Sequence, residues 1–446
     1  MNLVQKLRQD DLMSKVISHS AHLFSSNSIS LVLSVVQGVL AARLLGPAGY
    51  GLIAIVMSYA STINGFFSFR MSETVVRYGG EYLEKNEKQK ASALIKAASL
   101  GEMTVSVLAF IVVVLSAGIA TRSIAKTPGT EWMFIVYSLG LLANFNTETS
   151  TGILQITDKI KLQGTINLVQ SIVSALLVVG AFILKGTLAF VLIAYLIGKV
   201  TMGLGLFIAA QVQLHRVLGQ GWFRAPFSVL PSFGELFRFA FTSNLSATAI
   251  LIFRESEILW VGYFLTSEAA GLYKVAYNTI SLLSVPADPL ILTVYPELNR
   301  LIVQKAWPRL RNFLRKVTTL AFAYNIVLAL GFIILGRWVL WIYGAKYVVA
   351  YPALIALLIG MVFNYTLFWN RPLLLSFNLP AFPLWAALIA GLLKVGLAFP
   401  LVPRYGYVME AGLLSMYYVV SVGLIVWRGM RELKRQEASP NLTLDT

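Results

Sequence analysis

The sequence predicts an all-α membrane protein made of two related halves, and two observations carry that prediction. Hydrophobic residues make up 57% of the 446-residue chain and charged residues 13%, which is too little polar surface to cover a soluble protein of this size. Residues 43–52 and 263–272 are similar at an offset of 220 positions, with Gly51-Leu52 aligned on Gly271-Leu272. Each copy follows one long apolar run and opens the next.

Apolar runs of about 20 residues recur along the whole chain, and each is long enough to cross roughly 30 Å of hydrocarbon. We therefore expect about twelve transmembrane helices. The first six are expected at about 23–43, 50–70, 92–120, 132–156, 162–184 and 187–211. The second six are expected at about 236–263, 271–297, 312–335, 350–373, 380–402 and 407–427.

The distribution of lysine and arginine predicts that both termini are cytoplasmic. With the N-terminus inside, the inner segments carry 24 of these residues and the outer segments 7, as the positive-inside rule requires. An even number of spans then separates the two copies of the repeat, so the halves run parallel. The expected organisation is a cytoplasmic amphipathic N-terminal segment (1–22), an N-lobe (23–211), a cytoplasmic linker (212–235), a C-lobe (236–427) and a basic cytoplasmic tail (428–446).

Four stretches carry a family resemblance. They are Ala-Arg-Leu-Leu-Gly-Pro-Ala-Gly-Tyr-Gly-Leu at 42–52, Gly-Tyr-Phe-Leu-Thr-Ser-Glu-Ala-Ala-Gly-Leu-Tyr-Lys-Val-Ala-Tyr at 262–277, Tyr-Pro-Glu-Leu-Asn-Arg-Leu at 295–301 and Tyr-Gly-Ala-Lys-Tyr-Val-Val-Ala at 343–350. With these motifs the chain resembles the oligosaccharide (polysaccharide) flippases, the Wzx-like branch of the multidrug/oligosaccharidyl-lipid/polysaccharide exporter superfamily. It departs from them at Ala48, where an acid is common, and at Lys274, where a small residue is usual.

The resemblance implies two parallel six-helix lobes around a central cavity. It implies a flippase that moves a polyprenyl-diphosphate-linked oligosaccharide from the inner to the outer leaflet for surface polysaccharide biosynthesis, such as lipopolysaccharide O-antigen or exopolysaccharide. Transport would proceed by alternating access without ATP hydrolysis. The implied location is the cytoplasmic membrane of a bacterium or archaeon, and the implied partners are the lipid bilayer and polysaccharide polymerase or assembly proteins. We expect a monomer.

Four basic residues inside the spans are candidates for binding the diphosphate. A cation facing lipid at mid-span would cost about 2.5–3.5 kcal/mol, so such residues are expected to face protein or water. Guanidinium and ammonium groups both suit phosphate. The four candidates are Lys199, Arg254, Lys394 and, near the inner end of its span, Arg371. A structural alternative for Arg254 is an ion pair with Glu257, one helical turn further on.

Several spans carry polar residues at helical spacing, which predicts a wet face on each. The fourth and fifth spans supply the candidate cavity residues Asn144, Glu148, Gln155, Asn167 and Gln170. The alternative is hydrogen bonding between packed helices, which is common in membranes.

Three acids inside spans are candidates for binding a coupling ion, either H+ or Na+, because buried carboxylates hold protons more readily. They are Glu102, Glu148 and Asp288, which lies between Pro286 and Pro289 where backbone carbonyls are freed. A structural role for these acids is the alternative.

Other functions are excluded or disfavoured by what the sequence lacks. No metal or organic cofactor is expected: the chain has no cysteine, no phosphate-binding loop and no nucleic-acid signature. A multidrug exporter of organic cations remains an alternative, although the basic residues inside the spans argue against it. A membrane polysaccharide polymerase or ligase is the weaker alternative, because no large outer loop could carry catalytic groups.

Overall fold

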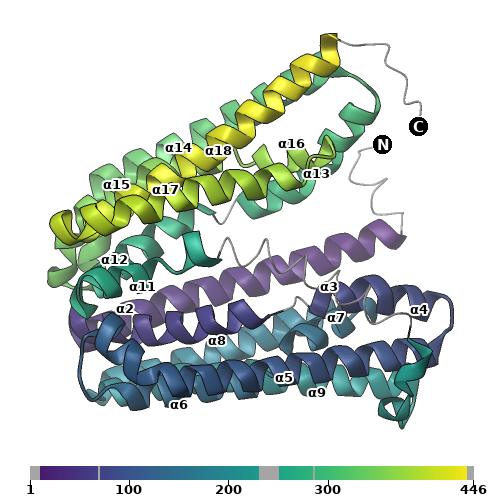
Figure 1. Cartoon of the computed structure of the whole chain (residues 1–446), viewed down its shortest axis with the longest axis horizontal. Helices are drawn as coiled ribbons and strands as arrows, with labels where there is room; N and C mark the ends of the chain where they lie inside the picture. The colour runs from purple at the N-terminus through teal and green to yellow at the C-terminus, as the bar shows by residue number, and fades with distance from the viewer. Residues whose placement is uncertain (1–10, 69–70, 231–250, 285–286, 439–446) are drawn as a thin grey trace. The chain divides into compact units, whose positions relative to one another are not determined.

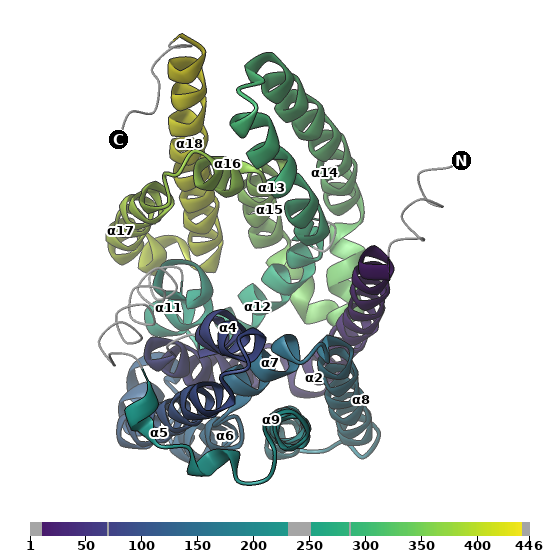
Figure 2. The same ribbon diagram turned by 90° about the vertical axis from the view of Figure 1, so that its right-hand side faces the viewer.

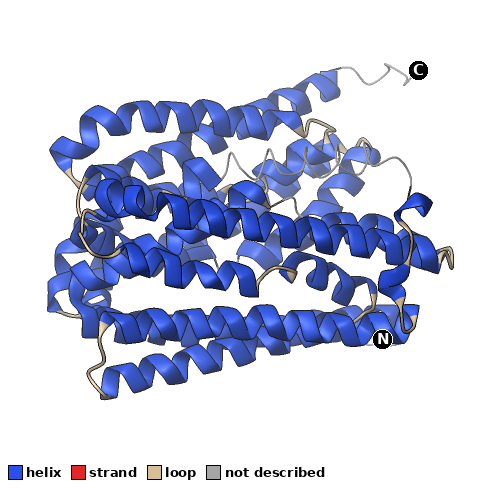
Figure 3. Ribbon diagram, turned by 60° about the horizontal axis from the view of Figure 1, so that its bottom comes forward, coloured by secondary structure: helices blue, strands red, loops and turns tan. Residues whose placement is uncertain are grey.

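In the computed structural model the chain folds into helices, and no strand is present in the part that the structure describes (Figure 3). The structure describes residues 11–68, 71–230, 251–284 and 287–438. The N-terminal elements are α2 (Asp11–Phe67), α3 (Met71–Thr74), η1 (Val75–Gly79), α4 (Gly80–Glu84), α5 (Lys88–Ala120), η2 (Thr121–Ala125), α6 (Glu131–Ala143), α7 (Thr147–Ile156), α8 (Ile160–Ile183), α9 (Leu188–Leu218), η3 (Trp222–Arg224) and η4 (Phe227–Val229).

The remaining described elements belong to the C-terminal half of the sequence (Figure 1). They are η5 (Leu251–Glu255), α11 (Glu257–Phe264), α12 (Ser267–Ser281), η6 (Leu282–Ser284), α13 (Ala287–Val303), α14 (Trp307–Tyr343), η7 (Ala345–Ala350), α15 (Tyr351–Thr366), α16 (Asn370–Ser376), α17 (Ala381–Tyr405) and α18 (Tyr407–Ala438).

The protein is a multi-pass helical membrane protein. Within the described residues, 8 helical stretches are long and apolar enough to cross a membrane. The first of them, Ser28–Glu84, covers most of the first expected span and all of the second. The expected spans at 132–156 and 271–297 are each divided between two shorter helices, α6 with α7 and α12 with α13. Most of the expected span at 236–263 lies outside the described residues. The count of twelve therefore stays a prediction.

Helix α2 changes direction at Gly46-Pro47. Gly46 has φ 67° and ψ 177°, a backbone conformation outside the helical region that glycine adopts without steric cost. Pro47 follows at once and has no backbone N–H to continue the preceding hydrogen bonds. The two expected spans at 23–43 and 50–70 therefore meet at this kink rather than across a long loop.

Two compact units divide the chain. Unit 1 contains Met1–Leu45, Val56–Ser123 and Thr127–Thr248, and unit 2 contains Gly46–Ile55, Ile124–Lys126 and Ala249–Thr446. In unit 1, α8 packs along α9, and α9 also contacts α6 and α7, as the views of Figures 1 and 2 show. In unit 2, α18 packs against both α15 and α17. The expected lobe and linker boundaries remain predictions.

Residues 46–52 of the first copy and the whole of the second copy lie in unit 2, where they contact each other. A Cβ atom placed on Gly51 of α2 would lie 1.8 Å from the carbonyl oxygen of Ser267, and one on Gly271 of α12 would lie 2.0 Å from the carbonyl oxygen of Pro47. The two helix backbones are thus in direct contact, which only glycine permits. The Ser267 hydroxyl also donates a 2.6 Å hydrogen bond to the carbonyl of Ala125.

Candidate functional site

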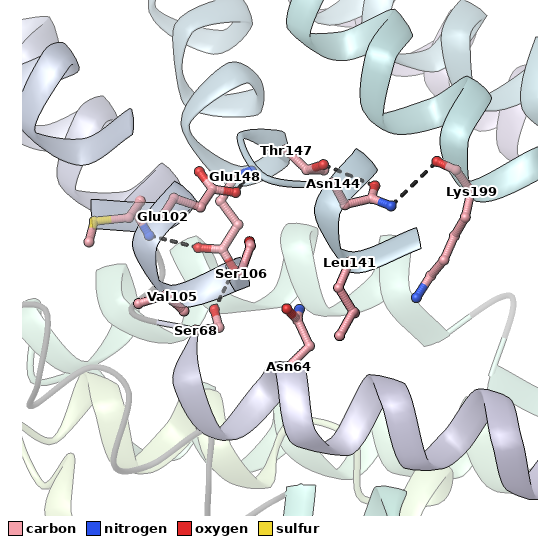
Figure 4. A pocket seen from close by; sticks show the side chains of 11 residues that line it. Asn64, Ser68, Glu102, Val105, Ser106, Leu141, Asn144, Thr147, Glu148 and Lys199 are labelled. Atoms are coloured by element: carbon pink, nitrogen blue, oxygen red, sulfur yellow. Dashed lines mark hydrogen bonds between the residues drawn. The ribbon is translucent and has the colours of Figure 1, made fainter. Parts of the chain in front are cut away.

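A polar cavity of about 230 Å³ lies in unit 1 (Figure 4). Six helices contribute to it: the end of α2, the start of α3, the middle of α5, the end of α6, the start of α7, and α9. Its lining consists of Asn64, Ser68, Met71, Glu102, Val105, Ser106, Leu141, Asn144, Thr147, Glu148 and Lys199. Of the residues predicted for the site, Glu102, Asn144, Glu148 and Lys199 are therefore brought together here.

The break between α6 and α7 forms one side of this cavity. Helix α6 ends at Ala143 and α7 begins at Thr147. The side-chain amide of Asn144 donates to the carbonyl oxygens of Gly140 (2.6 Å) and Lys199 (3.4 Å), and Thr147 donates its hydroxyl to the Asn144 carbonyl (3.0 Å). The Asn144 side chain therefore links the end of α6 to α9 and to the first residue of α7.

Glu102 caps the start of α7 from a different helix. Its two carboxylate oxygens accept the backbone N–H groups of Glu148 (2.8 Å) and Thr149 (2.9 Å), and its side chain is buried on α5. The first N–H groups of a helix have no partner within the helix, and the positive end of the helix dipole favours a negative charge there. The Glu102 carboxylate supplies both the acceptors for these N–H groups and the negative charge at this end of the helix.

Glu148 acts in the same way at the start of α3. Its carboxylate accepts the hydroxyl of Ser68 at 2.5 Å and the backbone N–H of Met71, the first residue of α3, at 2.7 Å. All four carboxylate oxygens of Glu102 and Glu148 thus accept hydrogen bonds from the protein. The predicted role of these two acids in ion coupling stays a prediction, and the observed geometry is that of the structural alternative.

Lys199 is the cation of the cavity. Its stem lies beside Gly140, where an added Cβ would be 3.2 Å from the lysine Cδ, so the glycine leaves room for the side chain. The ammonium nitrogen lies 5.3 Å from the centre of the Tyr137 ring, a cation–π distance. Within the described residues this ammonium group has no carboxylate within ion-pair distance, so its charge is available to a ligand.

The remaining polar residues predicted for the cavity are placed elsewhere in unit 1. Gln155 is exposed on α7, and Asn167 and Gln170 are half-buried on α8; none of them lines this cavity. The Gln170 side chain donates to the Ser174 hydroxyl at 3.2 Å, next to the contact of α8 with Gly198 of α9. Both residues are on α8, so this hydrogen bond lies within one helix, and the assignment of Gln170 to a cavity stays a prediction.

Sequence reasoning missed four polar lining residues, Asn64, Ser68, Ser106 and Thr147. A signal for the first three was present: Asn64 and Ser68 are four residues apart, as are Glu102 and Ser106, so each pair shares one helix face.

In unit 2, Arg254 lies among tyrosines. It belongs to the π-helical turn η5, and its guanidinium carbon lies 5.7 Å from the centre of the Tyr418 ring. Tyr277 and Tyr365 are further electrostatic neighbours. The Nε atom of Arg254 is buried and makes no hydrogen bond within the described residues.

The predicted alternative of an Arg254–Glu257 ion pair is wrong. Glu257 instead pairs with Lys394 of α17 and accepts a 2.8 Å hydrogen bond from the Tyr273 hydroxyl. Lys394 also lies 3.2 Å from Glu410 of α18 and donates to the carbonyl of Phe253 at 3.3 Å. We call Glu257, Lys394 and Glu410 the Lys394 cluster; their side chains are 3%, 1% and 0% exposed, so it is sealed from solvent.

Of the other predicted residues, Arg371 is exposed at the second position of α16. The side chain of Asp288 lies outside the described part of the chain. Both assignments stay predictions. The described residues contain no group of three or more histidine, cysteine and acidic side chains that could hold a metal ion.

Solved membrane transporters share this fold. An inward-facing multidrug resistance MATE family transporter of the MOP superfamily superposes with a TM-score of 0.75 at 12% identity, over 92% of this chain and 96% of that one. The lipid II flippase MurJ in an inward closed conformation superposes with a TM-score of 0.71 at 15% identity. The match covers 96% of this chain and 94% of MurJ. A MOP superfamily transporter from Pyrococcus furiosus gives 0.63 at 13% identity, over 98% of both chains.

The chain therefore has the fold of these solved transporters. Residues 17–302 match the family described as polysaccharide biosynthesis protein, and the chain belongs to that family. It is also 25% identical over 338 residues to the inner membrane protein YghQ of Escherichia coli (strain K12), a match that covers 75% of this chain and 94% of that protein. The resemblance seen in the sequence is thereby confirmed.

Proposed function

We propose that this protein flips a polyprenyl-diphosphate-linked oligosaccharide across the cytoplasmic membrane for the synthesis of a surface polysaccharide. It would work by ion-coupled alternating access without hydrolysing ATP, and with both termini in the cytoplasm. The solved lipid II flippase MurJ supports the choice of a lipid-linked substrate, because it has the same fold.

The observation that carries the proposal is the unneutralised Lys199 in a polar cavity of a polysaccharide biosynthesis protein. An ammonium group at 4 Å from a phosphate charge contributes about 4 kcal/mol at an effective dielectric constant near 20, before desolvation. Asn64 and Ser106 line the same cavity and offer the hydrogen-bond donors and acceptors that a sugar phosphate needs. Lys199 is accordingly assigned to the diphosphate.

Arg254 is the second cation that we assign to the substrate. A guanidinium with a buried, unpartnered Nε can donate to a phosphate oxygen, and the tyrosine rings beside it can stack on a sugar. Lys394 is left out of this assignment because two carboxylates already neutralise it.

An exporter of organic cations is the second candidate, favoured by the superposition on the multidrug resistance MATE transporter. Such a protein needs a carboxylate free to meet its substrate. In the described cavity both carboxylates, Glu102 and Glu148, are held by the protein's own donors, whereas the lysine is free. The charge in the cavity thus suits an anionic ligand.

The test is flipping in proteoliposomes that contain the purified full-length protein. A fluorescent polyprenyl-diphosphate oligosaccharide is followed by the fraction that a membrane-impermeant quencher can reach. We expect Lys199→Gln to slow flipping about tenfold, equivalent to about 1.4 kcal/mol, and Arg254→Glu to abolish it. Lys88→Gln, which changes an exposed lysine, is the matched control and should flip at the wild-type rate.

Insertion and folding of each variant are checked by size-exclusion chromatography before reconstitution. Wild-type flipping by both Lys199→Gln and Arg254→Glu would overturn the proposal. Uptake of a fluorescent organic cation by the wild-type protein, without any flipping of the lipid, would establish the exporter instead.

A further inference from the structure

Helix α12 in unit 2 has one accessible face along most of its length, and that face is polar. From Ala270 to Ser281 every residue is buried except Lys274, Tyr277, Asn278 and Ser281, which are each half-buried. These four follow the spacing i, i+3, i+4 and i+7, so they lie on one side of the helix over about 10 Å. We call them the Lys274 face.

The composition of the Lys274 face is that of a surface in contact with water. Where a long helix of unit 2 faces hydrocarbon, its accessible residues are apolar. On α14, Leu320, Val327 and Ile334 share one side of the helix and are 68%, 65% and 70% exposed. A charged side chain in such a position would be costly. The Lys274 face is therefore a surface for water and polar solutes rather than for lipid.

The charge of Lys274 is not neutralised by the protein. Within the described residues its ammonium group makes no ion pair and no hydrogen bond. The two acids of the Lys394 cluster are already paired with Lys394. Glu255, which lies near Tyr277, and Glu268 in the first turn of α12 are both exposed and form no ion pair in the part of the chain that the structure describes. Lys274 thus presents a positive charge to whatever contacts this face.

The internal repeat indicates that the helix does not need this charge in order to fold. At the offset of 220 positions Lys274 aligns with Ala54, which is 4% exposed. The equivalent turn in the first copy is therefore packed with a methyl group alone. Lysine in the second copy adds a long side chain and a charge that the packing of the helix does not require, which points to a role in binding.

The neighbours of Lys274 on this face suit a sugar ring. Tyr277, one turn further along α12, has a half-buried ring that can stack on the apolar side of a sugar. The side-chain amide of Asn278 makes no hydrogen bond within the described residues and can serve two sugar hydroxyls. The Lys274 ammonium group adds a point charge with rotatable donors, which suits a carboxylate. Together these groups match a sugar that carries a negative charge.

We propose that the Lys274 face binds an acidic sugar of the transported glycan, with the Lys274 ammonium group paired to the sugar carboxylate. The inference rests on the proposed function and names its substrate class, a lipid-linked oligosaccharide that contains a sugar of the uronic acid type. In a diphosphate that bridges a lipid and a sugar, each phosphate has one ionised oxygen, and Lys199 and Arg254 are already assigned to those charges. Lys274 is a further unpaired cation, so it calls for a further negative charge on the glycan itself.

The charge of the face is measured first, without any transport assay. The chain contains no cysteine, so Asn278→Cys gives the full-length protein a single thiol one turn from Lys274. In lipid nanodiscs, which leave both sides of the bilayer open, an anionic thiol reagent should modify it about tenfold faster than a cationic reagent of the same size. Adding Lys274→Gln should lower that ratio. Ile334→Cys on the lipid-facing side of α14 is the control and should react with neither reagent. An unreactive Asn278→Cys, or a ratio that Lys274→Gln leaves unchanged, would overturn the proposal.

Binding of the sugar is then followed by protection of the same thiol. A polyprenyl-diphosphate oligosaccharide with a uronic acid should protect Asn278→Cys at about tenfold lower concentration than its carboxyl-reduced counterpart. Adding Lys274→Gln should make the two concentrations equal, mainly by weakening the acidic lipid. Lys434→Gln, at an exposed lysine near the end of α18, is the matched control and should preserve the ratio. Equal protection by both lipids while Lys274 is present, or an equal loss for both in Lys274→Gln, would overturn the assignment to an acidic sugar.

Flipping assays separate this inference from the proposed function. At limiting lipid concentration the wild-type protein should flip the acidic lipid about tenfold faster than the carboxyl-reduced lipid. Lys274→Gln should remove the preference without lowering the melting temperature, because it breaks no ion pair. If neither lipid is flipped while protection still depends on Lys274, the proposed function fails and the binding site stands. If both lipids are flipped at equal rates and protect equally, the acidic-sugar assignment fails and the proposed function stands.

Discussion

The carboxylate of Glu102 accepts the backbone N–H of Glu148 at 2.8 Å, and the carboxylate of Glu148 accepts the backbone N–H of Met71 at 2.7 Å. Each acid thus supports the start of a helix to which it does not belong. The series links α5 to α7 and α7 to α3, three of the helices that line the cavity. The walls of the cavity are therefore positioned by the same two side chains that carry its negative charge.

Replacing Glu102 by Gln should destabilise unit 1. Glutamine has a single acceptor oxygen, so one of the two N–H groups at the start of α7 loses its partner. The expected cost is about 1–2 kcal/mol, which is the range for a lost helix cap or an unsatisfied buried donor. Thermal unfolding of the purified protein in detergent measures it. The exposed Glu84→Gln is the control, and an equal melting temperature for both variants would contradict the capping role.

Alanine at Gly271 should disrupt the contact between α12 and α2. Its Cβ would lie 2.0 Å from the carbonyl oxygen of Pro47, which is backbone and has no freedom to rotate away. We expect a loss of about 1–3 kcal/mol or failure to insert, as for overpacked sites, measured by thermal unfolding and by the yield of membrane-inserted protein. Gly423→Ala on α18, where a Cβ meets nothing within 4 Å, should be neutral or slightly stabilising.

The contact of α8 with α9 predicts that a second substitution restores the stability lost through a first. A Cβ on Gly198 would lie 1.9 Å from the hydroxyl oxygen of Ser174, whereas the Ser174 Cβ would be 3.3 Å away. Gly198→Ala alone should therefore destabilise the protein, and adding Ser174→Ala should restore most of the loss. The coupling between the two substitutions should be about 1–2 kcal/mol in a double-mutant cycle. Additive effects in that cycle would show that the two residues do not meet.

The charge of Lys199 predicts selectivity for the lipid headgroup. A polyprenyl-diphosphate glycan carries more negative charge than the corresponding monophosphate, so it should compete better for the cavity by about tenfold, or about 1.4 kcal/mol. Competition between the two unlabelled lipids in the flipping assay measures this ratio. Lys199→Gln should bring the ratio toward one, while Lys88→Gln should leave it unchanged. A ratio that does not respond to Lys199→Gln would remove the residue from the headgroup site.

Apolar periodicity located most of the long helices in the sequence. The expected spans at 92–120, 162–184 and 380–402 correspond to α5, α8 and α17, because a spanning helix needs an unbroken apolar run. The interruption between Ala143 and Thr147 was not predicted. It depends on Glu102, which reaches the start of α7 from another helix, and local sequence does not contain that contact.

The site was predictable to the extent that burial of charge is costly everywhere in a membrane. Lys199 and Glu148 were singled out for that reason, and both line the cavity. The partners of Lys394 were not predictable, since Glu257 and Glu410 lie on helices that only the tertiary fold brings together. Glu410 in particular lies in the first turn of its helix, where an acidic residue is common and does not by itself indicate a buried ion pair.

The contact between Gly51 and Gly271 makes sequence change in one copy of the repeat depend on the other copy. Each glycine leaves the space that the backbone of the opposite copy fills. A larger residue in either copy would therefore clash with the backbone of the other copy. The two copies of the repeat cannot diverge independently at this point. Their shared Gly-Leu pair is therefore the part of the duplication that we expect to remain recognisable longest, and a change at one position should appear together with a change at the other.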